Sequence, residues 1–373
     1  MSVKITDLKE DNGKMTFTIS GIDVSYANAL RRTIISNIPI IVFKTLPYEE
    51  NKADIKINTT RFHNEVVKQR LSCIPICIKD IDKFPIKNYV MELDVENNTD
   101  TIMIVTTKDF KIRDLVSNNY LDDGELKKIF PSYIPPDGNG EYYIDFLRLR
   151  PRLSDEIPGE RIKLSCQFSI GTAQDDGMFN VTGTCSYGFT PDYEKIEEQL
   201  AIRKQKWKDE DITETEIQFL AKNWKLLDGM RYVKKNSFDF IIESVGIYEN
   251  EEIVTKACDI VIEKLEILKN QLSEDTTLIK PSDNTLENSY DITLQNEDYT
   301  IGNILNNEIY RTFYTDLKVL NYVGFKKMHP HDDDSILRFS FEDKTKGLSH
   351  VQTILKTVIQ EAIKTLNNIK QLF

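Results

Sequence analysis

The pattern of apolar and polar positions between residues 15 and 39 predicts a strand, a cap and a helix. Phe17 and Ile19 alternate with threonines, as in a half-buried strand. Asp23 and Ser25 offer side-chain oxygens that can accept hydrogen bonds from the first turn of a helix. The helical part has an apolar stripe of Ala27, Leu30, Ile34 and Ile38, and Pro39 ends the helix. A second stripe is polar and comprises Asn28, Arg31 and Arg32. Packing alone does not require this polar stripe.

The same pattern returns from residue 290 to 305 and aligns with the first without a gap. The aligned pairs are Asp23 and Asp298, Ser25 and Thr300, Asn28 and Asn303, Leu30 and Leu305, and Ile34 and Ile309. In each copy a Tyr-Val pair, two lysines, an alternating strand and a long helix follow, first over 232–272 and again over 322–373. This repeat predicts an internal duplication in which a long insertion splits the first copy.

The long helices that close the two copies carry matching apolar stripes. The first stripe comprises Val254, Cys258, Val261, Leu265, Leu268 and Leu272, and the second comprises Val351, Ile354, Val358, Ala362, Leu366 and Ile369. Two such helices, one per copy, are natural packing partners. We therefore expect an intramolecular dimer core that contains Leu30, Ile34, Leu265, Leu268, Leu305, Ile309, Val358 and Ala362.

The repeat also predicts the domain boundaries. A discontinuous first dimerisation domain is expected at 1–50 and 230–272, an inserted domain at 51–229, a polar linker at 273–289 and a second dimerisation domain at 290–373. Most of the insertion has a period of two, typical of antiparallel strands. Exceptions are a helix that Asn58 or Thr59 can cap, a loop rich in proline and glycine at 131–140, and a charged helical segment at 193–227. An apolar strand is expected at 40–46, after the opening helix. Helices and mainly antiparallel strands together predict the fold class α+β.

Composition excludes several classes of function. The formal net charge of -12 argues against a surface that binds nucleic acid by neutralising phosphates, so no direct sequence-specific nucleic-acid binding is expected. No apolar run reaches the length of about 20 residues that a membrane span needs. The N-terminal residues lack the apolar core of a signal peptide. Five cysteines without framework spacing agree with a reducing compartment, so we expect an intracellular protein.

Several motifs resemble one family in their order along the chain. SYANALRRTIISNIP, at 25–39, resembles the opening helix of the alpha-type subunits of multisubunit DNA-dependent RNA polymerases, and NEVVKQRLSCIPI, at 64–76, resembles their second signature. FLRLRP and GTAQDDGMFNVTGTCSYGF are similar to the inserted domain of these subunits. YTIGNILNNEIY and YVGFKKMHP, in the second copy, are similar to the small alpha-type partner. The resemblance is weak over about 99–141 and 193–229.

The resemblance implies an alpha-subunit-like pseudo-dimer that acts as a non-catalytic assembly platform. Its implied partners are the second-largest and largest polymerase subunits, together with small subunits of the platform. In archaea and eukaryotes the two alpha-type subunits are separate chains, whereas one chain here resembles both. Such a fusion is similar to what large DNA viruses carry, which implies a virion, a cytoplasmic viral factory or a host nucleus as the location. A short linker makes pairing intramolecular, at an effective concentration of about millimolar.

The resemblance also places a docking face for the second-largest subunit on the opening helix. It comprises Asn28, Arg31, Arg32 and Ile35. In the repeat Arg31 and Arg32 align with Asn306 and Asn307, so a basic pair is the clear chemical difference between the two helices. An asymmetric face of this kind can hold one large subunit in one orientation. The alternative is that one of the arginines caps a helix or forms a pair within the domain.

Candidate metal sites are few. Cys73 and Cys77 could form half of a zinc site, but no second pair stands at ligand spacing, and strand periodicity makes Cys166 and Cys185 core residues. The related subunits that hold zinc or an iron-sulfur cluster use extra cysteines absent here, so we expect no metal, no cofactor and no catalytic residue. The alternative function is a stand-alone metal-dependent enzyme that uses His329, His331 and Asp332. We interpret these three residues as part of a solvated loop instead.

Overall fold

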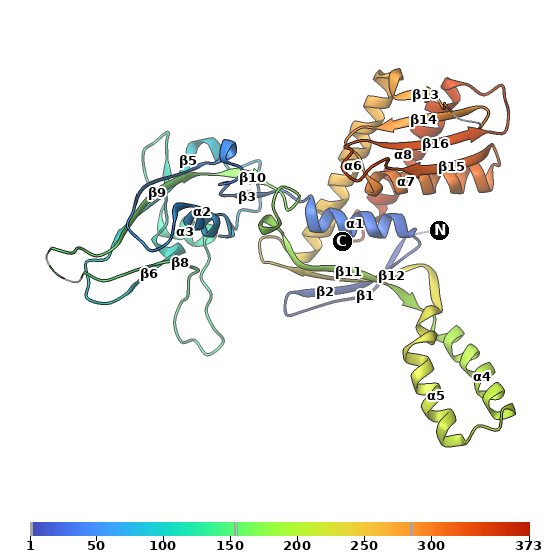
Figure 1. The fold of residues 1–373 in the computed structure, drawn as a ribbon, viewed down its shortest axis with the longest axis horizontal. Coiled ribbons are helices and arrows are strands. Elements are labelled where there is room, and N and C mark those ends of the chain that lie inside the picture. The colour runs from blue at the N-terminus through green and yellow to red at the C-terminus, as the bar shows by residue number, and fades with distance from the viewer. Residues whose placement is uncertain (1–2, 153, 155, 284–285) are drawn as a thin grey trace. The chain divides into compact units, whose positions relative to one another are not determined.

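The computed structural model describes residues 3–152, 154, 156–283 and 286–373 (Figure 1). Contacts divide the chain into two compact units. Unit 1 comprises Met1–Ile34, Thr184–Glu243 and Asn250–Phe373, and unit 2 comprises Ile35–Gly183 and Ser244–Glu249. Both copies of the repeat therefore share unit 1. None of the helices in the described ranges is long and apolar enough to cross a membrane.

Unit 1 contains two four-stranded sheets with the same arrangement. The first has the order β1 (Lys4–Asp11), β2 (Lys14–Ser20), β12 (Val233–Ser244) and β11 (Thr182–Pro191). The second has the order β13 (Ile279–Pro281), β14 (Ser289–Leu294), β16 (Ser335–Phe341) and β15 (Leu320–Lys326). Strand by strand, the order in the second sheet therefore repeats that in the first.

Helices follow the equivalent strands. In the first copy, β2 leads to α1 (Val24–Ser36), and in the second β14 leads to α7 (Tyr299–Ile309), which the π-helix η7 (Tyr310–Asp316) extends. The closing helices are α6 (Asn250–Glu274) and α8 (Leu348–Lys370), and they pack against each other. Between β11 and β12 stand α4 (Tyr193–Asp209), α5 (Glu214–Leu226) and the 3-10 turn η5 (Asp228–Arg231) (Figure 1).

Strand register extends the repeat through its second half. Phe17 of β2 lies opposite Phe240 of β12, and Ile292 of β14 lies opposite Leu337 of β16. Because Phe17 aligns with Ile292, Phe240 corresponds to Leu337. The same alignment continues without a gap into the closing helices. There it matches buried residues with buried residues: Val254 with Val351, Val261 with Val358, Leu265 with Ala362, and Leu272 with Ile369.

Unit 2 is built mainly from antiparallel strands. A four-stranded sheet has the order β4 (Ala53–Asn58), β9 (Arg161–Gln167), β5 (Tyr89–Glu96) and β7 (Lys111–Asp114). Two-stranded sheets pair β10 (Ser169–Gly171) with β3 (Ile40–Val42), and β6 (Met103–Thr106) with β8 (Asp145–Leu149). The α-helices are α2 (Asn64–Ser72) and α3 (Asp123–Ile129), and short 3-10 turns lie at Tyr48–Glu50, Ile86–Asn88, Thr107–Asp109 and Gly177–Phe179.

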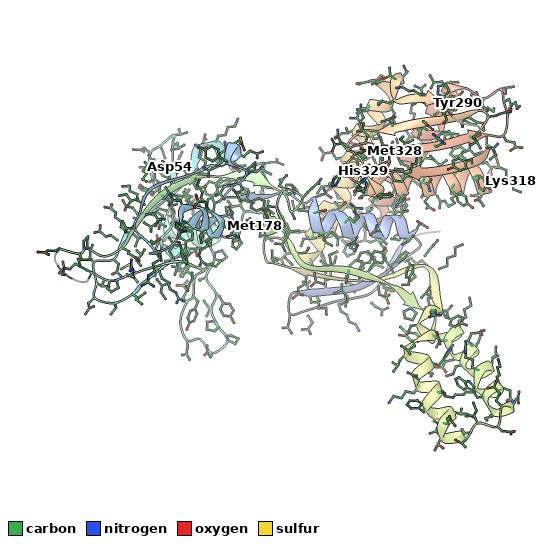
Figure 2. All side chains as sticks on the ribbon, in the orientation of Figure 1. Asp54, Met178, Tyr290, Lys318, Met328 and His329 are labelled. Atoms are coloured by element: carbon green, nitrogen blue, oxygen red, sulfur yellow. The ribbon has the colours of Figure 1, made fainter. Side chains whose placement is uncertain are left out.

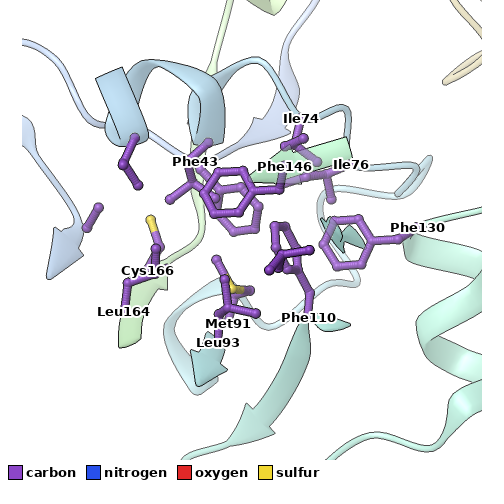
Figure 3. Packing of buried hydrophobic residues seen from close by; sticks show 14 of the residues in the cluster. Phe43, Ile74, Ile76, Met91, Leu93, Phe110, Phe130, Phe146, Leu164 and Cys166 are labelled. Carbon is purple, nitrogen blue, oxygen red and sulfur yellow. The ribbon is translucent and has the colours of Figure 1, made fainter. Parts of the chain in front are cut away.

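Aromatic rings form the centre of the core of unit 2 (Figure 3). The ring of Phe110 meets those of Phe130 and Phe146 edge-on, each at a centroid distance of 5.4 Å. Met91 and Leu164 of the four-stranded sheet pack into the same cluster. Cys166 is buried in this core and Cys185 is buried in unit 1, as strand periodicity predicted.

The structure differs from the expected elements in four places. The helix expected to begin near Asn58 begins at Asn64, because β4 runs through Asn58 and the Asn58 amide donates to Phe62 O and Asn64 Oδ1 across a turn. The strand expected at 40–46 is shorter and covers Ile40–Val42. The charged segment at 193–227 forms two helices that group with unit 1, whereas the sequence predicts it as part of the inserted domain.

The fourth difference concerns the expected linker at 273–289. Helix α6 continues to Glu274, the 3-10 turn Thr276–Leu278 follows, and β13 pairs with β14 as the edge of the second sheet. Leu278 and Ile279, two apolar residues next to each other in this mainly polar stretch, are buried. Its first half thus takes the place in the second sheet that β1 takes in the first. Residues 284 and 285 of the expected linker lie outside the described residues.

Candidate subunit-pairing and docking site

Helices α1 and α7 bury the same positions. From 26 to 35 and from 301 to 310, the burial class agrees at every aligned position, including the exposed last one. Leu30, Ile34, Leu305 and Ile309 are each at most 3% exposed. The apolar stripes predicted from the sequence therefore face the interior in both copies.

A buried polar contact joins α1 to α7. The hydroxyl of Tyr26 donates to Oε1 of Glu308 over 2.9 Å, and Arg311 donates to the other carboxylate oxygen over 2.6 Å. The side chain of Glu308 is 4% exposed, so its charge depends on these two donors. Burial raises the pKa of Tyr26 far above its ordinary value, and the neighbouring Glu308 carboxylate raises it further. Tyr26 therefore remains a hydrogen-bond donor.

A second contact joins the two helices at their opposite ends. Arg32 donates to Oδ2 of Asp298 over 2.5 Å, and the Oδ1 atom of Asp298 accepts from the backbone N–H of Thr300 at the start of α7. Burial alone would raise the pKa of Asp298, but the hydrogen bonds from Thr300 and the charge of Arg32 hold it below its ordinary value. Asp298 thus caps α7 and binds the first copy at the same time.

Neither contact has an equivalent across the pseudo-two-fold relation. By the repeat alignment, the counterparts of Tyr26 and Glu308 are Ile301 and Thr33, and those of Arg32 and Asp298 are Asn307 and Asp23. An apolar side chain thus replaces the phenol, and a neutral amide replaces the guanidinium. The apolar core is shared by both copies, whereas the polar contacts distinguish one copy from the other.

The closing helices complete the junction. Leu265 and Leu268 of α6 and Val358 and Ala362 of α8 are each at most 2% exposed. Near its end α8 pairs Lys370 with Asp259 of α6 over 2.5 Å. The ring of the last residue, Phe373, meets Phe17 of the first sheet edge-on at 5.0 Å. The closing helix of the second copy thus packs against the first copy through its buried middle and its last residues.

The expected docking residues lie on α1 but differ in their surroundings. Arg31 donates to Oδ1 of Asn28 through two nitrogens, at 3.1 and 2.9 Å, so these two side chains form one polar group on the helix. Ile35, in the last turn, is 38% exposed. Arg32 pairs with Asp298 instead, which corresponds to the alternative of an arginine that pairs within the domain.

The candidate metal ligands do not converge. Cys73 is exposed, with its Sγ 4.0 Å from the sulfur of Met178, and burial raises the pKa of the Cys77 thiol. His329 and His331 lie in the exposed loop between β15 and β16, where Figure 2 labels Met328 and His329. Among the described residues no group of three or more His, Cys, Asp or Glu side chains is placed to hold a metal ion.

Sequence reasoning missed Tyr26, Glu308 and Asp298 as members of the junction. The partners of the Tyr26–Glu308 contact are 282 residues apart, so no local pattern links them. One signal was available, because Glu308 occupies a position that the period of α7 assigns to the apolar stripe. A carboxylate on a buried stripe indicates a specific partner.

Two strand-and-helix copies that pack into one compact unit define a protein whose core is an intramolecular dimerisation fold. Residues 16–265, more than half of the chain, match the family model of the RNA polymerase Rpb3/Rpb11 dimerisation domain. The chain belongs to this family, which confirms the resemblance to alpha-type RNA polymerase subunits.

Similar proteins come from eukaryotes and archaea. The chain is 23% identical to DNA-directed RNA polymerase II subunit rpb3 of Dictyostelium discoideum, over 73% of this chain and 95% of that protein. It is 26% identical to DNA-directed RNA polymerase subunit Rpo3 of Thermococcus kodakarensis, over 72% of this chain and 96% of that protein. It is 25% identical to DNA-directed RNA polymerases I and III subunit RPAC1 of Saccharomyces cerevisiae, over 72% of this chain and 86% of that protein.

Proposed function

We propose that this chain is a non-catalytic assembly subunit of a DNA-directed RNA polymerase, and that it supplies both halves of the alpha-type pair. The observation that carries the proposal is the second copy in unit 1. Nearly the whole length of the rpb3 and Rpo3 relatives matches about three quarters of this chain, and the family match ends at residue 265, before the second copy begins. The second copy then stands where a separate small subunit would pair.

The geometry supports a platform better than an enzyme. The polar groups of the junction are engaged with each other: Tyr26 with Glu308, and Arg32 with Asp298. The alternative of a metal-dependent enzyme at His329, His331 and Asp332 has no support in the comparisons. The polymerase reaction itself would then belong to the large subunits that the platform holds.

The docking face for the second-largest subunit is the outer side of α1, with Asn28, Arg31, Arg32 and Ile35. Arg31 supports this role, because among the described residues its guanidinium bonds only to the neighbouring Asn28 and keeps donors for a partner. Arg32 contributes to this face while it holds Asp298. The largest subunit and small platform subunits are the further partners. Fusion of two alpha-type subunits favours a large DNA virus as the source, with the polymerase in the virion, a viral factory or the host nucleus.

Affinity purification of the tagged chain from its native source tests the proposal. Mass spectrometry should find the two largest polymerase subunits with the wild-type chain. Arg31→Ala should weaken recovery of the second-largest subunit by roughly tenfold, because an interface arginine commonly contributes about 2 kcal/mol or more. Arg32→Ala should also weaken it, whereas Asn307→Ala, the matched change on α7, should do much less. Equal recovery with all four chains would remove α1 from the docking face, and recovery of no polymerase subunit would contradict the function.

A further inference from the structure

A groove lies between the end of α6 and the start of α8 in unit 1. It has a volume of about 260 Å³. Its apolar floor consists of Leu272, Leu355 and Ile359, and two lysines, Lys269 and Lys356, stand on its walls. No carboxylate is among its lining residues. In a chain with a net charge of -12, a groove whose described lining residues include two lysines and no carboxylate is an uneven local distribution.

The pseudo-symmetry shows what this groove lacks. By the alignment of the closing helices, Lys356 corresponds to Asp259, and Ser273 corresponds to Lys370. At the other end of the helix pair Asp259 and Lys370 form an ion pair of 2.5 Å that joins α6 to α8. In the groove the equivalent positions hold Lys356 and Ser273, so the acidic member is missing. The same helix pair is therefore joined by an ion pair at one end and open at the other.

Both lysines remain available. Among the residues that the structure describes, neither Lys269 nor Lys356 has a carboxylate within ion-pair distance. Lys356 is exposed and Lys269 is half-buried. A ligand that brings a carboxylate between them would supply the missing charge, and an apolar side chain beside that carboxylate would cover the floor.

We propose that this groove is a docking site for an acidic peptide segment of a partner protein, in which a glutamate or aspartate stands beside an apolar residue. A protein segment fits better than nucleic acid, because the floor is apolar and the overall charge of the chain repels phosphates. The partner is expected to be another polymerase subunit, and only this identity rests on the proposed function.

Binding of a model ligand tests the chemistry without the polymerase. The probe is a fluorescein-labelled peptide of alternating glutamate and leucine, titrated with the full-length chain and followed by fluorescence anisotropy. Lys269→Glu with Lys356→Glu should weaken binding at least about tenfold, because both attractive charges become repulsive. The matched control is Lys364→Glu, which changes an exposed lysine of α8 that pairs with Glu361 outside the groove and should leave binding unchanged.

A second variant closes the groove. Ser273→Lys with Lys356→Asp copies the Lys370–Asp259 pair into this end, so it should abolish peptide binding while the melting temperature stays the same or rises. The proposal is overturned if the wild-type chain does not bind the peptide, if the charge-reversed chain binds it equally, or if a lysine-leucine peptide or a single-stranded oligonucleotide binds as well.

Amine labelling in the assembled complex tests the partner. Lys356 should react with an N-hydroxysuccinimide ester at least about tenfold more slowly in the polymerase than in the free chain, since a docked segment covers it. Lys364 should react equally in both. Equal reactivity of Lys356 in the two samples would overturn docking in the polymerase. Failure of the chain to enter any polymerase would contradict the proposed function, and the peptide experiment would still decide the groove.

Discussion

Helices α1 and α7 have the same burial pattern and different polar chemistry. Each residue from 26 to 35 is buried, half-buried or exposed like the aligned residue from 301 to 310. Yet Tyr26 of α1 corresponds to Ile301, and Glu308 of α7 corresponds to Thr33. Burial of apolar surface drives both copies into the same fold. This driving force is non-directional and depends on the apolar area that is buried, so different apolar side chains at the same positions give the same packing.

The polar differences determine which copy meets which. Glu308 of the second copy is buried and accepts a hydrogen bond from Tyr26 of the first copy. The second copy has Ile301 at the position of Tyr26, so it lacks this donor. If two second copies paired, Ile301 would face this carboxylate, and a buried charge would lose a donor. The comparison therefore indicates that the apolar stripes provide most of the stability and that a few polar side chains provide the pairing specificity. The following changes test that division.

The largest effect should come from making the closing helices alike at one core position. Leu265 is fully buried and its counterpart is Ala362. Leu265→Ala should lower the free energy of unfolding by about 2–4 kcal/mol, the range for emptying a buried aliphatic site. Ile267→Ala, on the same helix but half exposed, is the matched control and should cost less than about 1 kcal/mol. Similar losses for both in urea denaturation would contradict a shared core at Leu265.

A smaller effect should come from removing one polar partner between α1 and α7. Tyr26→Phe keeps the ring and deletes the hydroxyl, so the Glu308 carboxylate stays buried without that donor. The unfolding free energy should fall by about 1–3 kcal/mol. Combining Tyr26→Phe with Glu308→Leu should cost less than the sum of the single changes, because the orphaned charge is gone. Additive losses in the double-mutant cycle would show that the two residues act independently.

Arg32→Ala should have a smaller effect on stability, since the side chains of Arg32 and Asp298 are 37% and 34% exposed. A loss of about 0.2–1 kcal/mol is expected, and Asn307→Ala should lie within about 0.5 kcal/mol of the wild type. Thermal unfolding of the three proteins at neutral pH measures the difference. A larger loss for Asn307→Ala would reverse the comparison between the helices.

The smallest effect concerns pH. The pKa of Asp298 is lower in the folded chain than its ordinary value, partly because of Arg32. Its contribution to stability is thus complete above the unfolded pKa of about 3.9 and is lost as the pH falls through the folded value. The difference in melting temperature between the wild type and Arg32→Ala should shrink on acidification below about pH 4. A difference that grows over that range would have the wrong sign.

Much of the fold could be predicted because its elements have strong local periods. Helices α1, α6, α7 and α8 and strands β5 and β9 each follow a stripe or an alternation that the sequence shows directly. Strand β1 was missed because nearly all of its residues are exposed and nothing alternates. Strand β13 was assigned to a linker because three residues are too few to show a period.

The candidate site was predicted only in part. The polar stripe of Asn28, Arg31 and Arg32 follows from the helical period, but the period does not show what each side chain meets. Arg32 meets Asp298, which is 266 residues away in the sequence, and a contact of that kind depends on how the two copies pack. The gapless repeat came closest to revealing it, because it aligned Asp298 with the capping Asp23 and thereby placed it at the start of a helix.

The central claim is that one chain supplies both members of the alpha-type pair. Native mass spectrometry of the purified polymerase tests it by counting subunits. The expected result is one copy of this chain in each complex, with the two largest subunits present and no separate small alpha-type subunit. Two copies of this chain, or one copy together with a separate small alpha-type subunit, would contradict it.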